Sequence, residues 1–245
     1  NVGDIAYAIM EGLWIKEMDI DDPKNLKKIL TRFLKTADEN SKIIFIPTPN
    51  NPTGNNFNLE AIKLLIKRFP GIVVVDEAYA EFSSNSSVIP WLLKYPNLMV
   101  CQTFSKAQGM AGARLGMAFA HRDFINFFNR IKAPYNINSL TINVALKRIK
   151  EQDRVNTQVD LLLRERKRLE EAFAEIPFIK KCFPSDANFL MVRLDNSNLR
   201  YYQLLENGIV VRNPSKNLNC ENTLRISVGL PEENNRLIEV LQSLS

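Results

Sequence analysis

Residues 72–79 read Ile-Val-Val-Val-Asp-Glu-Ala-Tyr. The run of apolar, β-branched residues indicates a short strand that is buried on both faces of a sheet. Asp76 follows the run directly, so its carboxylate is expected at the mouth of that sheet. Burying an unpaired carboxylate is costly, and Asp76 therefore requires a partner. A helix N-cap or a surface position is the structural alternative, and a bound cation, either a metal ion or a protonated ring nitrogen, is the functional one.

Short apolar stretches of the same kind lie on both sides of this strand, separated by segments with the apolar spacing of helices. In chain order, the predicted elements are a helix over 24–34, a strand over 42–46, a helix over 58–69 with Asn58 as its N-cap, the strand over 72–75, strands over 98–102 and 115–120, and a helix over 124–131. This alternation predicts an α/β fold whose open, mostly parallel sheet is flanked by helices.

Polar segments follow three of the predicted strands directly. They are residues 48–54 (Thr-Pro-Asn-Asn-Pro-Thr-Gly), the pair Asp76-Glu77 and residues 103–106 (Thr-Phe-Ser-Lys). Ligands of such sheets bind outside the carboxyl ends of the strands. We therefore expect the three segments to converge on one edge of the sheet.

The pattern changes beyond Pro134, where longer helices alternate with short strands. The predicted elements are an amphipathic helix over 153–176, strands over 189–193, 209–212 and 224–228, and helices over 199–206 and 231–244. We therefore expect a large domain over 1–152, a linking helix over 153–176, and a small α+β domain over 177–245.

The composition excludes several classes of protein. With 45% apolar and 24% charged residues, the chain has ordinary soluble values, and its apolar runs are too short to span a membrane. His121 is the single histidine, which excludes a multi-histidine metal site, and we expect it at the start of a helix, as a surface or capping residue. The widely spaced Cys101, Cys182 and Cys220 indicate reduced thiols, with Cys101 in the core, and no secretory leader is recognised, so we expect a cytoplasmic protein.

Nucleic-acid binding is an alternative, because Lys and Arg exceed Asp and Glu by 32 to 27 and the net charge is +5. The basic residues are scattered, however. The densest basic run, Arg164 to Arg168, contains Glu165 and is followed by two further glutamates. That pattern is typical of a solvated helix face, so neither a nucleic acid nor a membrane is the expected partner.

Lys106 begins a stretch in which Gly109, Gly112 and Gly116 surround Arg114. Glycines permit turns that are closed to other residues and let a bulky group approach the main chain. A lysine amine attacks aldehydes only when it is neutral, and a neighbouring cation favours that state. By itself, Lys106 would be interpreted as an ordinary surface lysine, as most of the lysines in this chain must be.

Three segments that carry polar residues follow one another along the chain: residues 50–54, Asp76-Glu77-Ala78-Tyr79, and residues 103–106 with Arg114. Their order and spacing resemble the pyridoxal-phosphate-dependent aminotransferases of the aspartate aminotransferase type. The histidinol-phosphate branch of that family is the most similar, on residues 76–82, 133–136 and 224–229. The resemblance implies the type I pyridoxal-phosphate transferase fold, with the large domain binding the cofactor.

The resemblance also implies a role for each of these residues. Lys106 would form a Schiff base with pyridoxal 5'-phosphate and later move a proton. Asp76 would pair with the ring nitrogen, which supplies the cation that its burial requires. Asn51 and Tyr79 would hydrogen-bond the phenolic oxygen of the ring.

Further residues would bind the anionic groups. Ser105 and Arg114 would hold the cofactor phosphate, with Thr103 as a weaker candidate on the same side. Arg225 would bind the substrate carboxylate or its equivalent, and Arg212 would be a second anion site. For either arginine, an edge-strand position facing water is the structural alternative.

The implied activity is transfer of an amino group between L-histidinol phosphate and 2-oxoglutarate or glutamate, in histidine biosynthesis, by a homodimer and without a metal. The alternatives are an aromatic aminotransferase, a threonine-phosphate decarboxylase, and a non-catalytic protein of the same fold. Gln108 and Met117 stand where the family usually has aromatic residues. The family's N-terminal segment, with a glycine-rich phosphate turn and a ring-stacking aromatic, finds no match, so we expect it to be missing.

Overall fold

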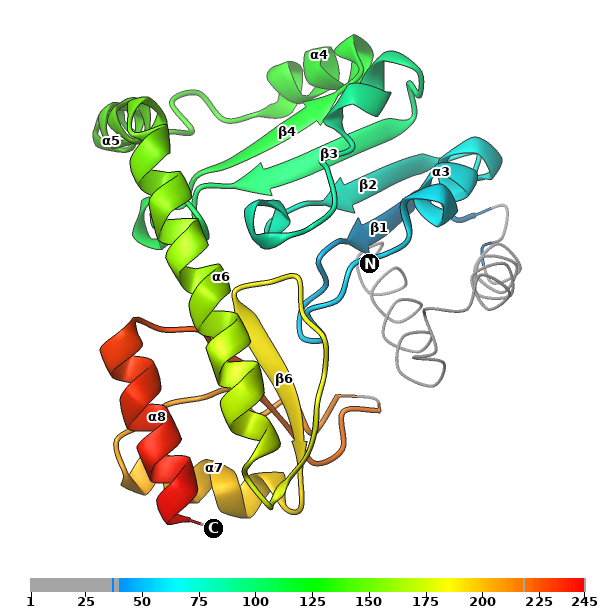
Figure 1. The fold of residues 1–245 in the computed structure, drawn as a ribbon. Helices are drawn as coiled ribbons and strands as arrows, with labels where there is room; N and C mark the ends of the chain where they lie inside the picture. The colour runs from blue at the N-terminus through cyan, green and yellow to red at the C-terminus, as the bar shows by residue number, and fades with distance from the viewer. Residues whose placement is uncertain (1–36, 38–39, 218, 245) are drawn as a thin grey trace. The chain divides into compact units, whose positions relative to one another are not determined.

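The computed structural model describes Ala37 and residues 40–217 and 219–244; the helix predicted over 24–34 lies outside them. By their internal contacts these residues form two compact units. The N-terminal unit comprises Phe57–Val155 and the described residues before Asn50, and the C-terminal unit comprises Asn50–Asn56 and Asn156–Ser245. Figure 1 labels helices and strands of both units.

The N-terminal unit is built on a four-stranded sheet in the order β1-β2-β3-β4. Its strands are β1 (Ile43–Pro47), β2 (Ile72–Asp76), β3 (Leu98–Thr103) and β4 (Gly116–Ala120). The first three are parallel, and β4 is antiparallel to β3. The predicted mostly parallel sheet is confirmed, and with it the position of Asp76 at the end of a buried strand.

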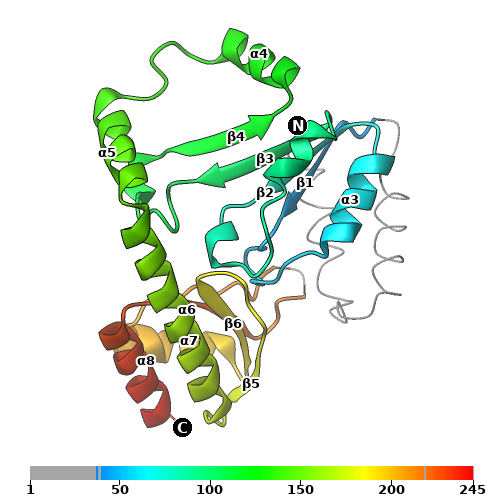
Figure 2. The same cartoon turned by 45° about the horizontal axis from the view of Figure 1, so that its top comes forward.

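Helix α3 (Leu59–Arg68) connects β1 to β2 and packs on one face of this sheet (Figure 2). Asn58 caps it as predicted, because its side chain accepts the amides of Glu60 and Ala61. The core of this face is made by alternate strand residues and by the inner side of α3: Ile44, Ile46, Val73, Val75, Leu98, Val100, Ile62, Leu65 and Ile66.

Two helices follow β4, namely α4 (Arg122–Ile131) and α5 (Ser139–Lys150). His121 is the N-cap of α4, as expected, since its ring accepts the Asp123 amide. Helix α5 was not predicted, because its apolar residues do not form one buried stripe. Short 3-10 turns complete the unit: η1 (Ala80–Phe82), η2 (Ile89–Leu93) and η3 (Ala111–Ala113).

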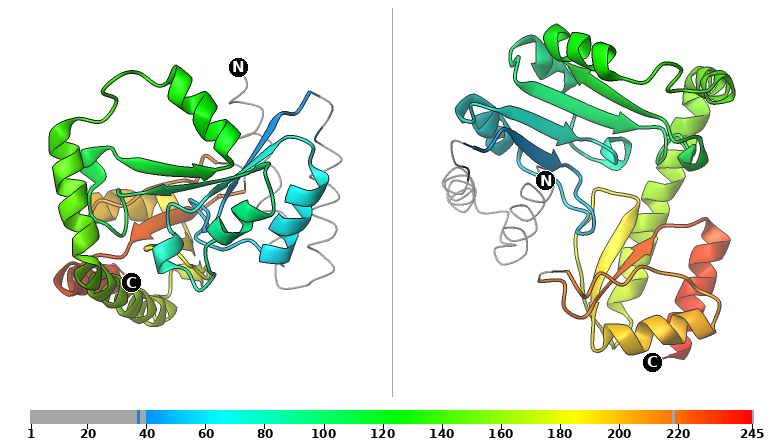
Figure 3. Two further views of the ribbon diagram at one scale, coloured as in Figure 1. Left: turned by 90° about the horizontal axis from the view of Figure 1, so that it is seen from above. Right: turned by 180° about the vertical axis from the view of Figure 1, so that it is seen from behind.

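The C-terminal unit has an antiparallel sheet in the order β5-β6-β7. Its elements are α6 (Gln152–Ala174), which belongs to this unit from Asn156 onward, β5 (Ile179–Cys182), β6 (Phe189–Leu194), α7 (Ser197–Glu206), β7 (Thr223–Ser227) and α8 (Pro231–Ser243). Figure 3 shows α7 and α8 beside the sheet. The core closes between sheet and helices, with Phe173, Leu190, Leu204, Leu224 and Leu241 among its buried members.

Two local predictions are wrong, and one strand was missed. Residues 209–212 do not form a strand: only Arg212 pairs, in an isolated bridge with Arg225. Pro214 follows closely, and a proline has no amide hydrogen with which to continue a ladder. Strand β5 was missed, because its two lysines interrupt the apolar pattern. Cys101 is half-buried rather than a core residue, because it lies near the end of β3.

Within the described part of the chain, no helix combines the length and apolar character needed to cross a membrane.

Candidate active site

The carboxyl ends of β1, β2 and β3 lie side by side, because the three strands are parallel and in register. The ladder continues beyond the strands. The Thr48 amide donates to the Asp76 carbonyl (2.9 Å), and the Glu77 amide donates to the Cys101 carbonyl (2.8 Å). Thr48, Asp76 and Thr103, with which the three polar segments begin, therefore lie at one edge of this sheet, as expected.

Asp76 is half-buried at this edge and forms no ion pair with a described residue. Its carboxylate accepts the Ala78 amide (3.0 Å). Burial raises the pKa of Asp76 above its ordinary value and the charge of Glu77 adds to this, whereas the Ala78 hydrogen bond and the charge of Lys106 lower it. A bound cation would relieve this desolvation, so the carboxylate is suited to pair with one.

Lys106 and Tyr79 come together from the ends of two neighbouring strands. The Lys106 ammonium lies 5.0 Å from the centroid of the Tyr79 ring, a cation–π contact. The tyrosine is buried, whereas the lysine is exposed, so its amine is open to a ligand. Gly109, at φ +67°, closes the turn by donating its amide to the Lys106 carbonyl (2.9 Å).

The residues predicted to bind phosphate continue along the same segment. The Thr103 hydroxyl accepts a hydrogen bond from the Ser105 amide (3.1 Å) and donates one to the Leu115 carbonyl (3.3 Å). Both bonds stabilise the turn that follows β3. Arg114 is exposed, has a left-handed backbone (φ 51°, ψ 46°), and donates to the Ala111 carbonyl (3.3 Å). Because the residue is exposed, its guanidinium is accessible to an anion.

The C-terminal unit brings a second set of predicted residues together. The Arg225 guanidinium donates to the Asn51 side-chain oxygen (2.5 Å) and lies 5.0 Å from the Phe189 ring centroid. Arg212 and Arg225 exchange both backbone hydrogen bonds, at 3.0 and 2.8 Å. Residues paired in this way extend from the same face, and like charges directly opposite each other are destabilising. Two arginines so placed suit an anion between them.

The segment Asn50–Asn56, which carries Asn51, belongs with the C-terminal unit. Gly54 has φ +82° and lies so close to Ser185 that a side chain at this position would collide with it. The Asp186 amide also donates to the Gly54 carbonyl (2.7 Å). Nothing in the sequence indicates these contacts, because the partners lie more than a hundred residues apart along the chain.

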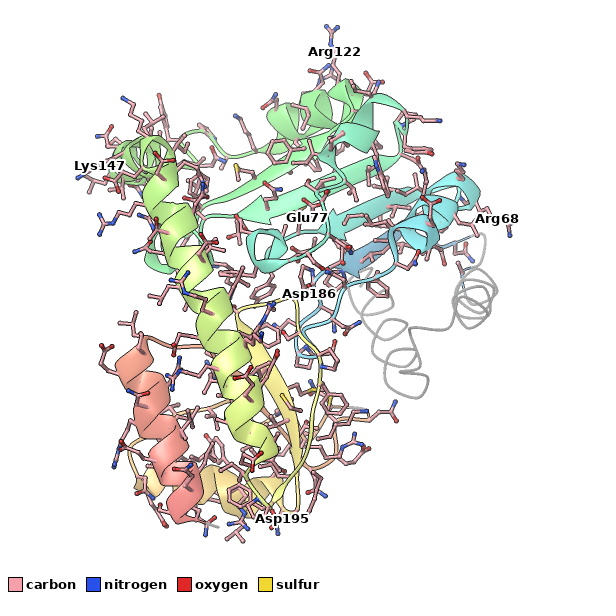
Figure 4. All side chains as sticks on the ribbon, in the orientation of Figure 1. Arg68, Glu77, Arg122, Lys147, Asp186 and Asp195 are labelled. Carbon is pink, nitrogen blue, oxygen red and sulfur yellow. The ribbon has the colours of Figure 1, made fainter. Side chains whose placement is uncertain are left out.

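The sequence reasoning missed Glu77 as a functional candidate. Figure 4 labels it beside the ends of β2 and β3. Its carboxylate is buried and fully engaged with neighbouring residues, whereas the sequence shows only an acid next to Asp76. Among the residues that the structure describes, no group of His, Cys, Asp and Glu is arranged to hold a metal ion.

The family model of the class I and II aminotransferases matches residues 7–241. The chain belongs to this family. A histidinol-phosphate aminotransferase of Flavobacterium psychrophilum is 48% identical to this chain over 220 residues, which are 90% of the chain and 63% of the relative. The chain thus spans less than two thirds of the length of that relative.

Solved structures agree with the assignment of the chain to this family. The histidinol-phosphate aminotransferase of Clostridium acetobutylicum has a TM-score of 0.80 at 25% identity, over 89% of this chain and 66% of that one. The enzyme of Sinorhizobium meliloti, solved in complex with pyridoxal 5'-phosphate, has a TM-score of 0.79 at 25% identity, over 90% and 62%. The expected type I aminotransferase fold is confirmed.

Proposed function

We propose that the protein is a pyridoxal-phosphate-dependent transaminase that moves an amino group between L-histidinol phosphate and 2-oxoglutarate or glutamate, in histidine biosynthesis. The observation that carries the proposal is the arrangement at the sheet edge. An accessible lysine amine lies over Tyr79, and a half-buried carboxylate without an ion pair to any described residue ends the neighbouring strand. The name of the Flavobacterium relative supports the choice of substrate.

The described residues fit pyridoxal 5'-phosphate. The group supplies a conjugated, protonated ring that accepts the negative charge left when a proton is removed from the substrate. Asp76 would hold the proton on the ring nitrogen, and its desolvated carboxylate suits that cation. Tyr79 would donate to the phenolic oxygen, and Ser105 and Arg114 would bind the phosphate, with Thr103 beside them. The assignment of Asn51 to the phenolic oxygen rests on the family resemblance.

Lys106 would bind the cofactor aldehyde and carry the proton of the substrate carbon. An exposed amine on a turn closed by Gly109 can reach a ligand without unfolding the sheet edge. A proton carrier positioned in this way contributes about 10²–10⁴-fold to a rate.

Arg225 and Arg212 would bind the anionic ends of the substrates. A guanidinium donates two parallel hydrogen bonds to a carboxylate or a phosphate, which fixes the orientation of the substrate. From the family resemblance we also infer that the protein is a homodimer in the cytoplasm, which sedimentation analysis and cell fractionation would check.

The first experiment is a visible absorption spectrum after addition of pyridoxal 5'-phosphate, followed by borohydride reduction and mapping of the modified lysine. We expect the modification at Lys106. Modification elsewhere, or none, would contradict the proposal.

The second experiment compares steady-state amino transfer from histidinol phosphate and from phenylalanine, with release of carbon dioxide from threonine phosphate measured in parallel. We expect histidinol phosphate to have the highest kcat/KM. Faster turnover of phenylalanine would identify an aromatic aminotransferase, and carbon dioxide release would identify a decarboxylase.

A further inference from the structure

Glu77 is a buried carboxylate that the proposed chemistry does not use. It is 3% exposed and accepts three hydrogen bonds, from the Ser87 hydroxyl (2.6 Å), the Val88 amide (2.7 Å) and the Gln102 side-chain amide (2.9 Å). All three donors are neutral groups, and a hydrogen bond to a carboxylate is stronger than one between two neutral groups.

The donors belong to different parts of the N-terminal unit. Gln102 lies in β3, one residue before Thr103, where the turn to Lys106 begins. Ser87 and Val88 lie in the segment that leads into η2. A single side chain therefore connects the end of β2 to the end of β3 and to a segment between them (Figure 4).

The main chain of Glu77 belongs to the same arrangement. Its amide donates to the Cys101 carbonyl (2.8 Å), and its carbonyl accepts the Ala80 amide (3.1 Å), which closes the turn that carries Tyr79. Residue 77 thus follows Asp76, begins the Tyr79 turn, and holds the strand that leads to Lys106.

Stability alone does not account for a carboxylate at this position. Well-packed apolar residues commonly replace buried charged groups with no loss of stability. A carboxylate that accepts several hydrogen bonds orients its donors, because these bonds hold the connected segments in one geometry.

We propose that Glu77 is a positioning residue of the active site: by binding Gln102 and the Ser87–Val88 segment together, it fixes the ends of β2 and β3 and thereby the separation of Asp76 and Lys106. The functional part of this inference rests on the proposed function, since it assumes that Asp76 and Lys106 act on one cofactor.

The first test needs no cofactor. Amide hydrogen exchange of the 245-residue chain is measured by mass spectrometry for wild type, Glu77→Gln, Ser87→Ala and Gln102→Ala. Loss of a bond to a buried charge shifts a local opening equilibrium by about tenfold. We expect Glu77→Gln to speed exchange about tenfold in both 83–88 and 103–110. Ser87→Ala should affect only the first segment, and Gln102→Ala only the second.

The second test measures the affinity for pyridoxal 5'-phosphate by absorbance titration. Removing a group that orients ligand-binding side chains typically weakens binding about tenfold or more, so we expect at least a tenfold loss in Glu77→Gln and partial recovery in Glu77→Asp. Glu165→Gln is the matched control, because Glu165 is a buried, hydrogen-bonded carboxylate in the C-terminal unit. It should lower the melting temperature without changing the affinity.

The proposal is overturned if Glu77→Gln speeds exchange in 83–88 alone, or if it lowers stability while the affinity stays that of wild type. If Glu77→Gln does not fold, Gln102→Ala decides, since it leaves Glu77 in place and must loosen 103–110. A wild-type chain that is not modified at Lys106 after borohydride reduction contradicts the proposed function instead, and the exchange result still decides the role of Glu77.

Discussion

Asp76 of the N-terminal unit and Glu165 of the C-terminal unit are both withdrawn from water, but their surroundings are opposite. Glu165 accepts hydrogen bonds from Arg168 (2.6 Å) and from the Asn234 side chain (2.8 Å). The Arg168 hydrogen bond lowers the pKa of Glu165 although burial opposes it, whereas burial raises the pKa of Asp76. Glu165 is thus paired within the C-terminal unit, whereas Asp76 has no ion pair with a described residue of the N-terminal unit.

The apolar residues show the same contrast. The C-terminal unit closes its core between one sheet and three helices. In the N-terminal unit, α4 buries none of its residues. Of the sixteen exposed large apolar residues in the described part of the chain, ten lie between Phe127 and Ile149. The C-terminal core is therefore enclosed by its own helices, whereas the N-terminal unit, beside its packed core, exposes the Lys106 side chain and many apolar residues of α4 and α5.

Lys106→Ala is the most severe test of this contrast. We expect amino transfer to fall by at least about 10²–10⁴-fold, because the proton carrier is removed. The free energy of unfolding should change by no more than about 0.5 kcal/mol, because the side chain is exposed. Lys147→Ala, at another exposed lysine, is the control. Retained activity in Lys106→Ala would show that the exposed amine of the N-terminal unit is not required for amino transfer.

A pair of phenylalanines compares packing in the two units. Phe173 of α6 is 0% exposed within the C-terminal core, and Phe127 of α4 is 59% exposed. We expect Phe173→Ala to cost about 3–5 kcal/mol in the free energy of unfolding, and Phe127→Ala about 0.5 kcal/mol or less. Denaturant titration measures both. Equal losses would mean that α4 is packed as tightly as the C-terminal core.

Glu165→Gln tests how much the hydrogen bonds from Arg168 and Asn234 to the buried Glu165 carboxylate stabilise the fold. At neutral pH we expect a loss of about 1–3 kcal/mol, the usual contribution of hydrogen bonds to a charged group. The lowered pKa of Glu165 means that its stabilisation is present above the ordinary value of 4.5 and is lost as the pH falls through the lower folded-state value. The difference between variant and wild type should therefore shrink below pH 4.5 in thermal unfolding. A difference that stays constant would exclude the ionised pair as its cause.

Asp76→Asn should give the smallest stability change, and one of opposite sign. The pKa of Asp76 is raised, so the folded cofactor-free chain loses stability as the pH rises from the ordinary value of 3.8 through the higher folded-state value. The variant should then be slightly more stable than wild type at neutral pH, with no gain below pH 3.8, and its cofactor affinity should fall. A destabilised variant at neutral pH would show that neighbouring groups in the folded chain already stabilise the Asp76 carboxylate, as they do that of Glu165.

Local patterns in the sequence were sufficient for most of the N-terminal sheet. The β-branched run before Asp76 and the cap at Asn58 each depend on neighbouring residues, so strand and helix could be predicted. The parallel pairing of β1 with β2 agrees with the helix predicted between them, whereas only the short turns η1 and η2 separate β2 from β3. Both pairings are parallel, so Asp76 and Lys106 follow strands that end at the same edge. Helix α5 and strand β5 have no such pattern. Which of their residues become buried depends on the elements they pack against.

The sequence by itself determined the class of fold, the family, and the lysine and aspartate proposed for the chemistry, because strand periodicity, turn residues and motif spacing are local properties of the chain. Tertiary structure decided that Asn51 contacts Arg225, that Arg212 lies opposite Arg225, and that Glu77 is held by Gln102. These contacts form only when distant segments of the chain fold together, because each buried polar group then needs a hydrogen-bond donor or acceptor.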